Sequence, residues 1–156
     1  MNDARAEYRR AAELRSALRQ FLRTSDRVTR EHGLTTQRYE LLLMIKTSRD
    51  GSERATLGEL MERLHAPQST VTELVHRAED LGLLARELDP KNRRAVYLRV
   101  TPEGERRLAG AVAKLAGERK RLVSLLRELA RSGDGGGRRL GAGAESGGSS
   151  VPRHAA

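Results

Sequence analysis

Hydrophobic residues recur at helical spacing in two neighbouring stretches near the middle of the chain. Residues 57–64 (LGELMERL) and 68–81 (QSTVTELVHRAEDL) carry apolar side chains at steps of three and four residues, which is typical of helices that bury one face. Only a short turn containing Pro67 separates them. The pattern therefore predicts two amphipathic helices joined by a tight turn.

The pattern changes after Gly82. Two short apolar-rich runs, at 83–88 and 95–100, flank the polar tip DPKNRR at 89–94. In the second run aliphatic residues occupy every second position, as in a half-buried strand, so the two runs predict a β-hairpin. Helix, turn, helix and hairpin together predict a winged helix-turn-helix over residues 56–101.

Longer helices are predicted on both sides of this winged unit. Residues 5–31 carry apolar residues at three- and four-residue steps, with Arg and Glu between them, and Gly33 marks the stop. A similar pattern runs over 102–130, where Gly117 is expected to bend or break the helix. The fold class is therefore mainly α with a small β-wing, and the winged core is flanked by long helices.

A shorter helix is predicted between the first long helix and the winged unit. Thr35 or Thr36 can cap it, and we expect its apolar LLLMI run at 41–45 to be fully buried. The next segment, TSRDGSER at 47–54, is polar and contains Gly51, so it is predicted to be a loop.

Capping motifs indicate where several helices begin. The motif TLGE at 56–59 is a capping box. The motif TPE at 101–103 offers an N-cap Thr, a Pro at the first helical position and an acid near the positive end of the helix dipole. The motif TVTE at 70–73 competes with Pro67 as the start of the helix at 68–81. The sequence therefore places the first residue of this helix only to within about three residues.

Composition and charge narrow the class of protein. The 156 residues suffice for one domain with a modest core. Lys and Arg number 30 against 21 Asp and Glu, and the formal net charge of +9 favours a polyanionic partner. The chain has no Cys, which excludes disulfides and thiolate metal sites. Since it has neither a bilayer-spanning apolar run nor a signal peptide, we expect a soluble, cytoplasmic protein without membrane contact.

The composition changes near the C-terminus. Residues 132–156 are rich in Gly, Ser, Ala and Arg and have too few apolar residues to bury a core, so they are predicted to form a disordered tail. Residues 1–131 then make up one domain, with the winged core at 56–101 and the long helices at 5–31 and 102–130.

Each long helix has an apolar stripe, and the winged unit is too small to cover both. On the second helix Leu122 and Leu126 lie four residues apart on this stripe. A helical layer shared with a second copy would cover the stripes, and a two-fold homodimer would present two winged units together. We therefore expect dimerisation through these helices.

Polar side chains lie opposite the apolar stripe of the helix at 68–81, and the hairpin beside it is basic. Gln, Ser, Thr and Glu can bond base edges in the major groove of duplex DNA, while His and Arg suit phosphates. The candidate DNA-binding residues are Gln68, Ser69, Thr70, Thr72, Glu73, His76 and Arg77 in the helix and Lys91, Arg93 and Arg94 in the hairpin. The alternatives are a solvated helix face, on which Glu73 caps Thr70, and a hydrated turn.

Other kinds of chemistry find little support in the sequence. The four His residues form no i, i+4 pair and have no acidic cluster at metal-ligand spacing. Neither a G-x-S-x-G elbow nor a glycine-rich phosphate loop is present. We therefore expect no enzyme activity, no metal site and no cofactor.

The run QSTVTELVHRAEDLGLLARELDPKNRRAVYLRVTPEG at 68–104, framed by the two long helices, resembles the MarR family of bacterial transcriptional regulators. It contains counterparts of the recognition helix, the Leu-Gly-Leu turn into the wing, the wing tip and the Thr-x-x-Gly entry to the next helix. The resemblance covers roughly residues 5–130 and leaves only the tail outside.

The wing departs in two positions from the family pattern D-x-R-D-x-R. Asp89 and Arg94 match it, whereas Lys91 replaces Arg and Asn92 replaces Asp. Positive charge persists at the tip, so contact with the DNA backbone or minor groove remains expected. A wing salt bridge that needs an acid at position 92 is not expected.

The resemblance also implies a homodimer that binds pseudo-palindromic operators and responds to a small, often phenolic or anionic, effector. It implies a ligand-binding cleft between the first helix, the helix at 36–46 and the start of the helix at 102–130. Arg38 and Tyr39 could supply a cation and a hydroxyl there. The simpler interpretation is that Tyr39 belongs to the core and Arg38 to the surface.

The sequence thus indicates a DNA-binding transcriptional regulator that acts by operator occupancy, as repressor or activator. One alternative is a protein–protein adaptor that reuses a winged helix, and such an adaptor would show little salt-dependent binding to duplex DNA. A second is a nonspecific architectural DNA binder, which would lack a large affinity gap between operator and random DNA.

Overall fold

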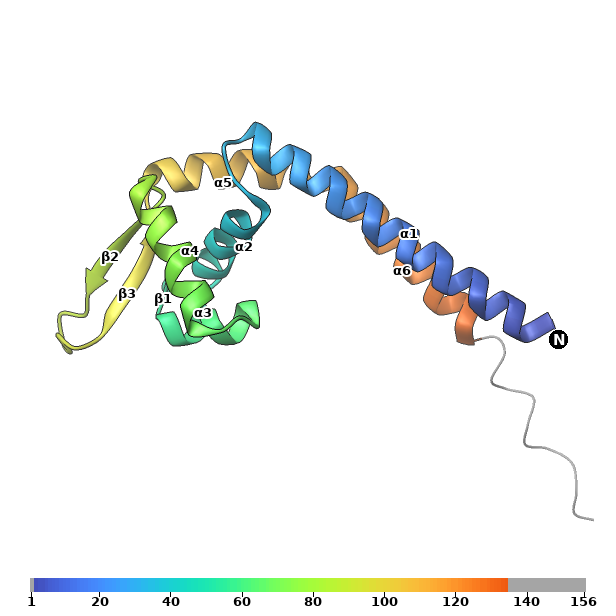
Figure 1. Cartoon of the computed structure of the whole chain (residues 1–156), viewed down its shortest axis with the longest axis horizontal. Coiled ribbons are helices and arrows are strands. Elements are labelled where there is room, and N and C mark those ends of the chain that lie inside the picture. The colour runs from blue at the N-terminus through green and yellow to red at the C-terminus, as the bar shows by residue number, and fades with distance from the viewer. Residues whose placement is uncertain (1, 135–156) are drawn as a thin grey trace, which may run out of the picture.

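Six helices and three short strands make up residues 2–134, the part of the chain that the computed structural model describes (Figure 1). In chain order they are α1 (Asn2–Glu31), α2 (Thr36–Lys46), β1 (Arg54–Ala55), α3 (Leu57–Leu64), α4 (Gln68–Asp80), β2 (Leu84–Leu88), β3 (Val96–Val100), α5 (Pro102–Lys114) and α6 (Ala116–Asp134). The predicted class, mainly helical with a small β-wing, is confirmed. None of the described helices is long and apolar enough to cross a membrane.

Two of the capping motifs fix helix starts as predicted. At the start of α3 the Glu59 N–H donates to Thr56 Oγ1 (3.3 Å), and the Thr56 N–H donates to Glu59 Oε2 (2.8 Å). At the start of α5 the Gly104 N–H donates to Thr101 Oγ1 (3.1 Å), and Pro102 is the first helical residue. Each motif satisfies backbone donors that a helix start otherwise leaves unpaired.

The structure also decides the two starts that the sequence leaves open. Thr35 caps α2, since its hydroxyl accepts a hydrogen bond from the Arg38 N–H (3.2 Å). Helix α4 begins at Gln68, directly after Pro67, without a side-chain cap. A start at Thr70 is therefore wrong.

Helix α2 is the centre of the core and packs against α1, α3, α4, α5 and the sheet. Within its LLLMI run Leu41, Leu42 and Ile45 are completely buried, whereas Leu43 and Met44 are only partly buried. The expectation of a fully buried run is wrong for these two residues. The reason is that neighbouring elements do not enclose α2 on all sides.

Strand β1 is the element that the sequence pattern misses. The loop predicted at 47–54 is wrong at its last residue, because Arg54 pairs with Arg99 and Ala55 with Leu98. The three antiparallel strands have the order β1-β3-β2. A strand of two residues is too short to show the alternation by which strands are recognised.

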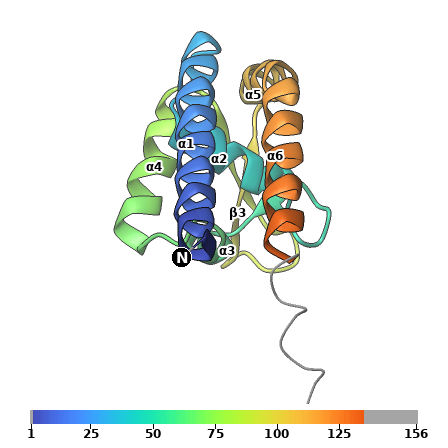
Figure 2. The ribbon, with the colours of Figure 1, turned by 90° about the vertical axis from the view of Figure 1, so that its right-hand side faces the viewer.

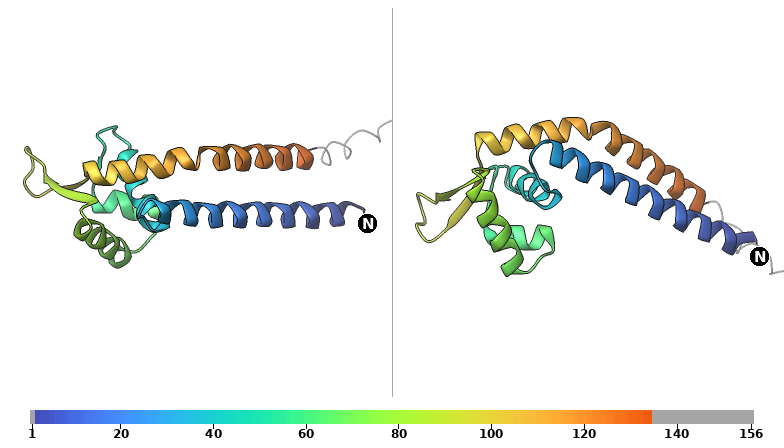
Figure 3. Two further views of the ribbon diagram at one scale, coloured as in Figure 1. Left: turned by 90° about the horizontal axis from the view of Figure 1, so that it is seen from above. Right: turned by 45° about the horizontal axis from the view of Figure 1, so that its top comes forward.

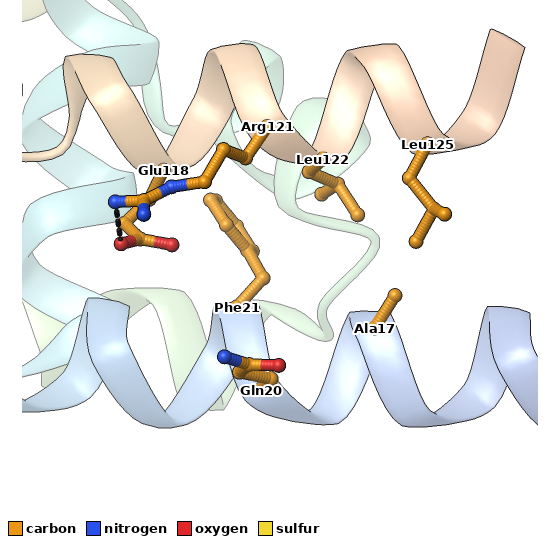
Figure 4. Close-up of a pocket in the computed structure, with 7 residues that line it drawn as sticks. All are labelled: Ala17, Gln20, Phe21, Glu118, Arg121, Leu122 and Leu125. Carbon is orange, nitrogen blue, oxygen red and sulfur yellow. Dashed lines mark hydrogen bonds and ion pairs between the residues drawn. The ribbon is translucent and has the colours of Figure 1, made fainter. Parts of the chain in front are cut away.

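Helices α1 and α6 form an antiparallel pair, here called the arm, which extends away from a winged head made of α2–α5 and the sheet (Figures 1 and 3). Phe21 and Ala17 of α1 face Leu122 and Leu125 of α6, respectively, around a small cavity of about 110 Å³ (Figure 4). The two apolar stripes therefore cover each other in part within one chain. The sequence expectation that both need a second copy is wrong for this part, and Leu122 packs inside the arm.

The long C-terminal helical pattern is broken into two helices, as expected, but at a different residue. Leu115, which is buried, separates α5 from α6 two residues before Gly117. Helix α6 then continues to Asp134, three residues past the predicted domain end at 131. The remainder of the predicted tail, residues 135–156, lies outside the described residues.

Candidate nucleic-acid interface

Helix α4 lies at the surface of the head, with one side in the core. Val71, Val75 and Ala78 are buried and Leu74 is partly buried, so the opposite side of the helix faces outward. That side holds the seven residues that the sequence singles out: Gln68, Ser69, Thr70, Glu73, His76 and Arg77, which are exposed, and Thr72, which is half-buried. All of them except Thr70 line one surface hollow.

Polar contacts on this face join neighbouring side chains of α4. The Arg77 guanidinium pairs with Glu73 one turn earlier, and His76 Nδ1 lies 3.7 Å from Glu79 Oε2. The alternative in which Glu73 caps Thr70 is wrong, because the helix has already begun at Gln68. An exposed i, i+4 ion pair contributes only about 0.3–0.5 kcal/mol, so little energy opposes release of Arg77 to an anionic partner.

The wing tip is a compact turn that exposes its three basic side chains. Asp89 Oδ1 accepts a hydrogen bond from the Lys91 N–H (2.9 Å), and Asn92 Oδ1 accepts one from the Arg94 N–H (3.2 Å). Asn92 thus shapes the turn without adding a negative charge. Within residues 2–134, no acidic side chain forms an ion pair with Lys91, Arg93 or Arg94, so their charges remain available to a partner.

Arg99 of β3, another basic residue of the hairpin, is neutralised by an acid that sequence reasoning did not consider. Arg99 Nε donates to Glu87 Oε2 (2.8 Å), and the Arg54 guanidinium lies 3.8 Å from the same carboxylate and 4.1 Å from the centre of the Tyr97 ring. The Arg99 side chain is the main cause that lowers the pKa of Glu87. The free positive charge of the wing is therefore concentrated at its tip.

The two candidate effector-binding residues lie on α2, and Tyr39 lies close to Arg119 of the arm. Tyr39 is buried in the core, and its burial raises the pKa of its hydroxyl although nearby Arg119 of α6 opposes this shift. Arg38 is half-buried, and its Nε atom is buried without a hydrogen-bond partner in the described part of the chain. The core position agrees with the simpler interpretation of Tyr39.

The head and the arm together define a winged helix-turn-helix protein with long flanking helices. A sequence profile described as the MarR family matches residues 32–95. The transcriptional regulator HosA of Escherichia coli O111:H- is 30% identical over 108 residues, which cover 62% of this chain and 77% of HosA. The chain belongs to the MarR family. It spans only 40%, 52% and 49% of the length of three other curated regulators that it matches.

Solved structures of MarR-family proteins share the fold. AbsC, a MarR family transcriptional regulator from Streptomyces coelicolor, superposes with a TM-score of 0.65 at 20% identity, over 85% of this chain and 90% of AbsC. A point mutant of MarR from E. coli, complexed with operator DNA, gives a TM-score of 0.56 at 18% identity, over 76% of this chain and 91% of MarR. At such identities the likeness establishes the fold alone.

Proposed function

We propose that this protein is a sequence-specific DNA-binding transcriptional regulator that acts as a homodimer by occupying an operator. The main observation is the polar face of α4 beside three basic side chains at the wing tip without an acidic partner among the described residues. A helix in the major groove with a basic hairpin on the adjacent backbone is the docking geometry that this arrangement suits. Family membership, and the operator complex of a MarR structure, support the same function.

Four exposed aliphatic residues on the arm support dimerisation. Leu18 and Leu22 of α1, and Val123 and Leu126 of α6, are 37–56% exposed. On each helix, these exposed residues are rotated by about 100° about the helix axis from the residues that pack α1 against α6. The rotation has the same sense along both helices, and the helices are antiparallel. Both pairs of exposed residues therefore lie on the same side of the arm. A second arm can cover both at once, and this is the interface we propose.

The proposal includes response to a small anionic or phenolic effector, which rests on the family resemblance. Arg38 supports it, since its buried Nε has no hydrogen-bond partner in the described residues. An effector that binds where α2 meets the arm would favour one orientation of the head over another. DNA affinity would then change by linkage.

Substitutions at the wing tip and on α4 should have different effects on DNA binding. Arg94→Ala should weaken binding to every duplex, because its charge meets phosphates, and should lower the slope of log affinity against log salt by about 0.9 per contact, or twice that in a dimer. Gln68→Ala should leave that slope unchanged and reduce discrimination between operator and scrambled DNA by roughly 1–3 kcal/mol. Fluorescence anisotropy across a salt series measures both, after footprinting on DNA flanking the gene has located the operator.

Arg127→Ala is the matched control, since it removes one exposed positive charge from the arm instead of the wing. It should reproduce the wild-type slope. Wild-type binding that hardly depends on salt would support the adaptor alternative, and equal affinity for operator and scrambled duplexes would support the architectural one. A wild-type slope in Arg94→Ala would exclude the wing tip as a DNA contact.

The domain proposal assigns these activities to residues 1–131, which α6 extends to Asp134, and none to residues 135–156. Deletion of residues 135–156 should leave dimerisation intact and change operator affinity by less than about tenfold, or about 1.4 kcal/mol. The deleted segment carries three Arg and one Glu and has few apolar residues. Light scattering and anisotropy of the truncated chain check this. A truncated protein that is monomeric or binds more weakly than this limit would give the tail a function.

A further inference from the structure

A groove separates α4 from the hairpin. Leu57 of α3, Val75 of α4 and Leu98 of β3 contribute apolar surface to it, and its volume is about 480 Å³. At the end of the ladder Val96, which also lines the groove, pairs with Leu88, and these two side chains remain 37% and 61% exposed. The outer half of the wing is therefore not fixed to α4 by core packing.

A bidentate ion pair crosses this groove. Glu79, in the last turn of α4, accepts hydrogen bonds from Arg86 of β2, from Nε to Oε1 (2.8 Å) and from Nη2 to Oε2 (3.0 Å). Within the described residues it is the sole ion pair between α4 and the hairpin. A bidentate pair restricts the orientation of the guanidinium as well as its distance. It therefore constrains the orientation of β2 relative to α4.

The Glu79 carboxylate is better protected than the surface pairs around it. Its side chain is 21% exposed, compared with 64% for Glu73. Partial burial reduces the screening that weakens exposed pairs. The same carboxylate lies 3.7 Å from His76 Nδ1, on the candidate DNA-binding face. Glu79 thus connects that face to the middle of the wing.

We propose that Glu79 is a positioning residue for DNA recognition, which acts through Arg86 to fix the angle between α4 and the wing. At the correct angle the base contacts of α4 and the phosphate contacts of the wing tip fit one duplex simultaneously. This role rests on the proposed function and adds to it a residue that does not itself contact DNA. A freely pivoting wing would still bind phosphates, but it would no longer favour the duplex that α4 reads.

Electrostatics and positioning predict different operator-to-scrambled affinity ratios for Glu79→Gln. The substitution keeps the shape of the side chain and removes a negative charge near a DNA-binding face. If charge alone mattered, operator and scrambled duplexes would both bind more tightly by the same factor. If Glu79 positions the wing, the operator-to-scrambled affinity ratio falls, by at least about fivefold, the low end of the cost of one mismatched base pair.

Two further variants test the ion pair: one changes Arg86, and the other exchanges Glu79 and Arg86. Arg86→Lys keeps the positive charge but loses bidentate geometry, so the ratio should fall in this variant as well. Exchanging the two residues, with Glu79→Arg and Arg86→Glu in one chain, restores an ion pair across the groove and should restore most of the ratio. Glu62→Gln removes an exposed acid from α3 and serves as the control, for which the wild-type ratio is expected.

The readout is anisotropy with operator and scrambled duplexes, and a thermal melt of each variant shows that it is folded. A wild-type ratio in both Glu79→Gln and Arg86→Lys overturns the proposal, as does a ratio that the exchanged pair fails to improve. If Glu79→Gln unfolds, Arg86→Lys and the exchanged pair decide. A wild-type protein without any operator preference would instead contradict the proposed function, so the two failures can be told apart.

Discussion

Val123→Glu combined with Leu126→Glu will convert the protein into a folded monomer that binds an operator at least about 100-fold more weakly, or about 2.7 kcal/mol. The two side chains are exposed on the same side of α6 and contribute half of the proposed dimer interface. Burying a carboxylate without a partner in that interface costs far more than the lost apolar contact. Because neither side chain packs against α1, the arm of a single chain should stay intact.

Light scattering gives the mass, circular dichroism the helix content and anisotropy the affinity. Ser124→Glu with Ser132→Glu is the matched control, since it adds the same two charges at exposed polar positions of α6. This control should remain a dimer and bind the operator normally. A Val123 and Leu126 double variant that is still dimeric would show that the interface lies elsewhere.

Gly104→Ala will lower the free energy of unfolding by about 3 kcal/mol, at the upper end of the usual cost of overpacking. A Cβ at this position would lie 2.3 Å from the Leu83 carbonyl oxygen and 2.8 Å from Val100 Cγ1. The Leu83 oxygen cannot move away freely, because it accepts a hydrogen bond from the Thr101 N–H (3.0 Å). The glycine of the Thr-x-x-Gly motif is therefore required where α5 crosses the start of β2.

Gly58→Ala, in contrast, should raise the free energy of unfolding of the same fold. Gly58 is exposed on α3, and the nearest atom to its added Cβ is Thr56 Oγ1 at 3.9 Å. Replacing a helical glycine with alanine without a clash should stabilise the chain by about 0.5–1 kcal/mol. Thermal or urea unfolding of both variants at one protein concentration makes the comparison. Equal stabilities of the two variants would contradict the close approach at Gly104.

Much of the fold is predictable from local signals in the sequence. Thr56 and Thr101 reveal helix starts because the bonds that they make span only three residues. The outward face of α4 is equally accessible, since a helical period fixes which side chains lie opposite the apolar stripe. For this reason the structure groups Gln68, Thr72 and His76 around one hollow, as the sequence predicts.

The features that the sequence does not reveal depend on long-range pairing. Nothing in the pattern links Glu79 of α4 to Arg86 of β2, because ion pairs between different elements have no period. The same limit applies to Leu122 and Leu126, which the sequence places on one stripe. Leu122 faces the inside of the arm whereas Leu126 is exposed, and this difference depends on where α1 lies.

The interruption at Leu115 has a mechanical consequence for how two heads would be spaced. Helix α5 belongs to the head and the 19-residue α6 to the arm. Figure 2, which views the molecule from the free end of the arm, shows α1 and α6 side by side with α4 behind them. A helix of this length is about 28 Å long, so a rotation of about 10° at Leu115 displaces its far end by about 5 Å. Half-sites on DNA lie about 34–36 Å apart. In the proposed dimer, small changes of angle at this joint would therefore act as a lever on the separation of the two heads.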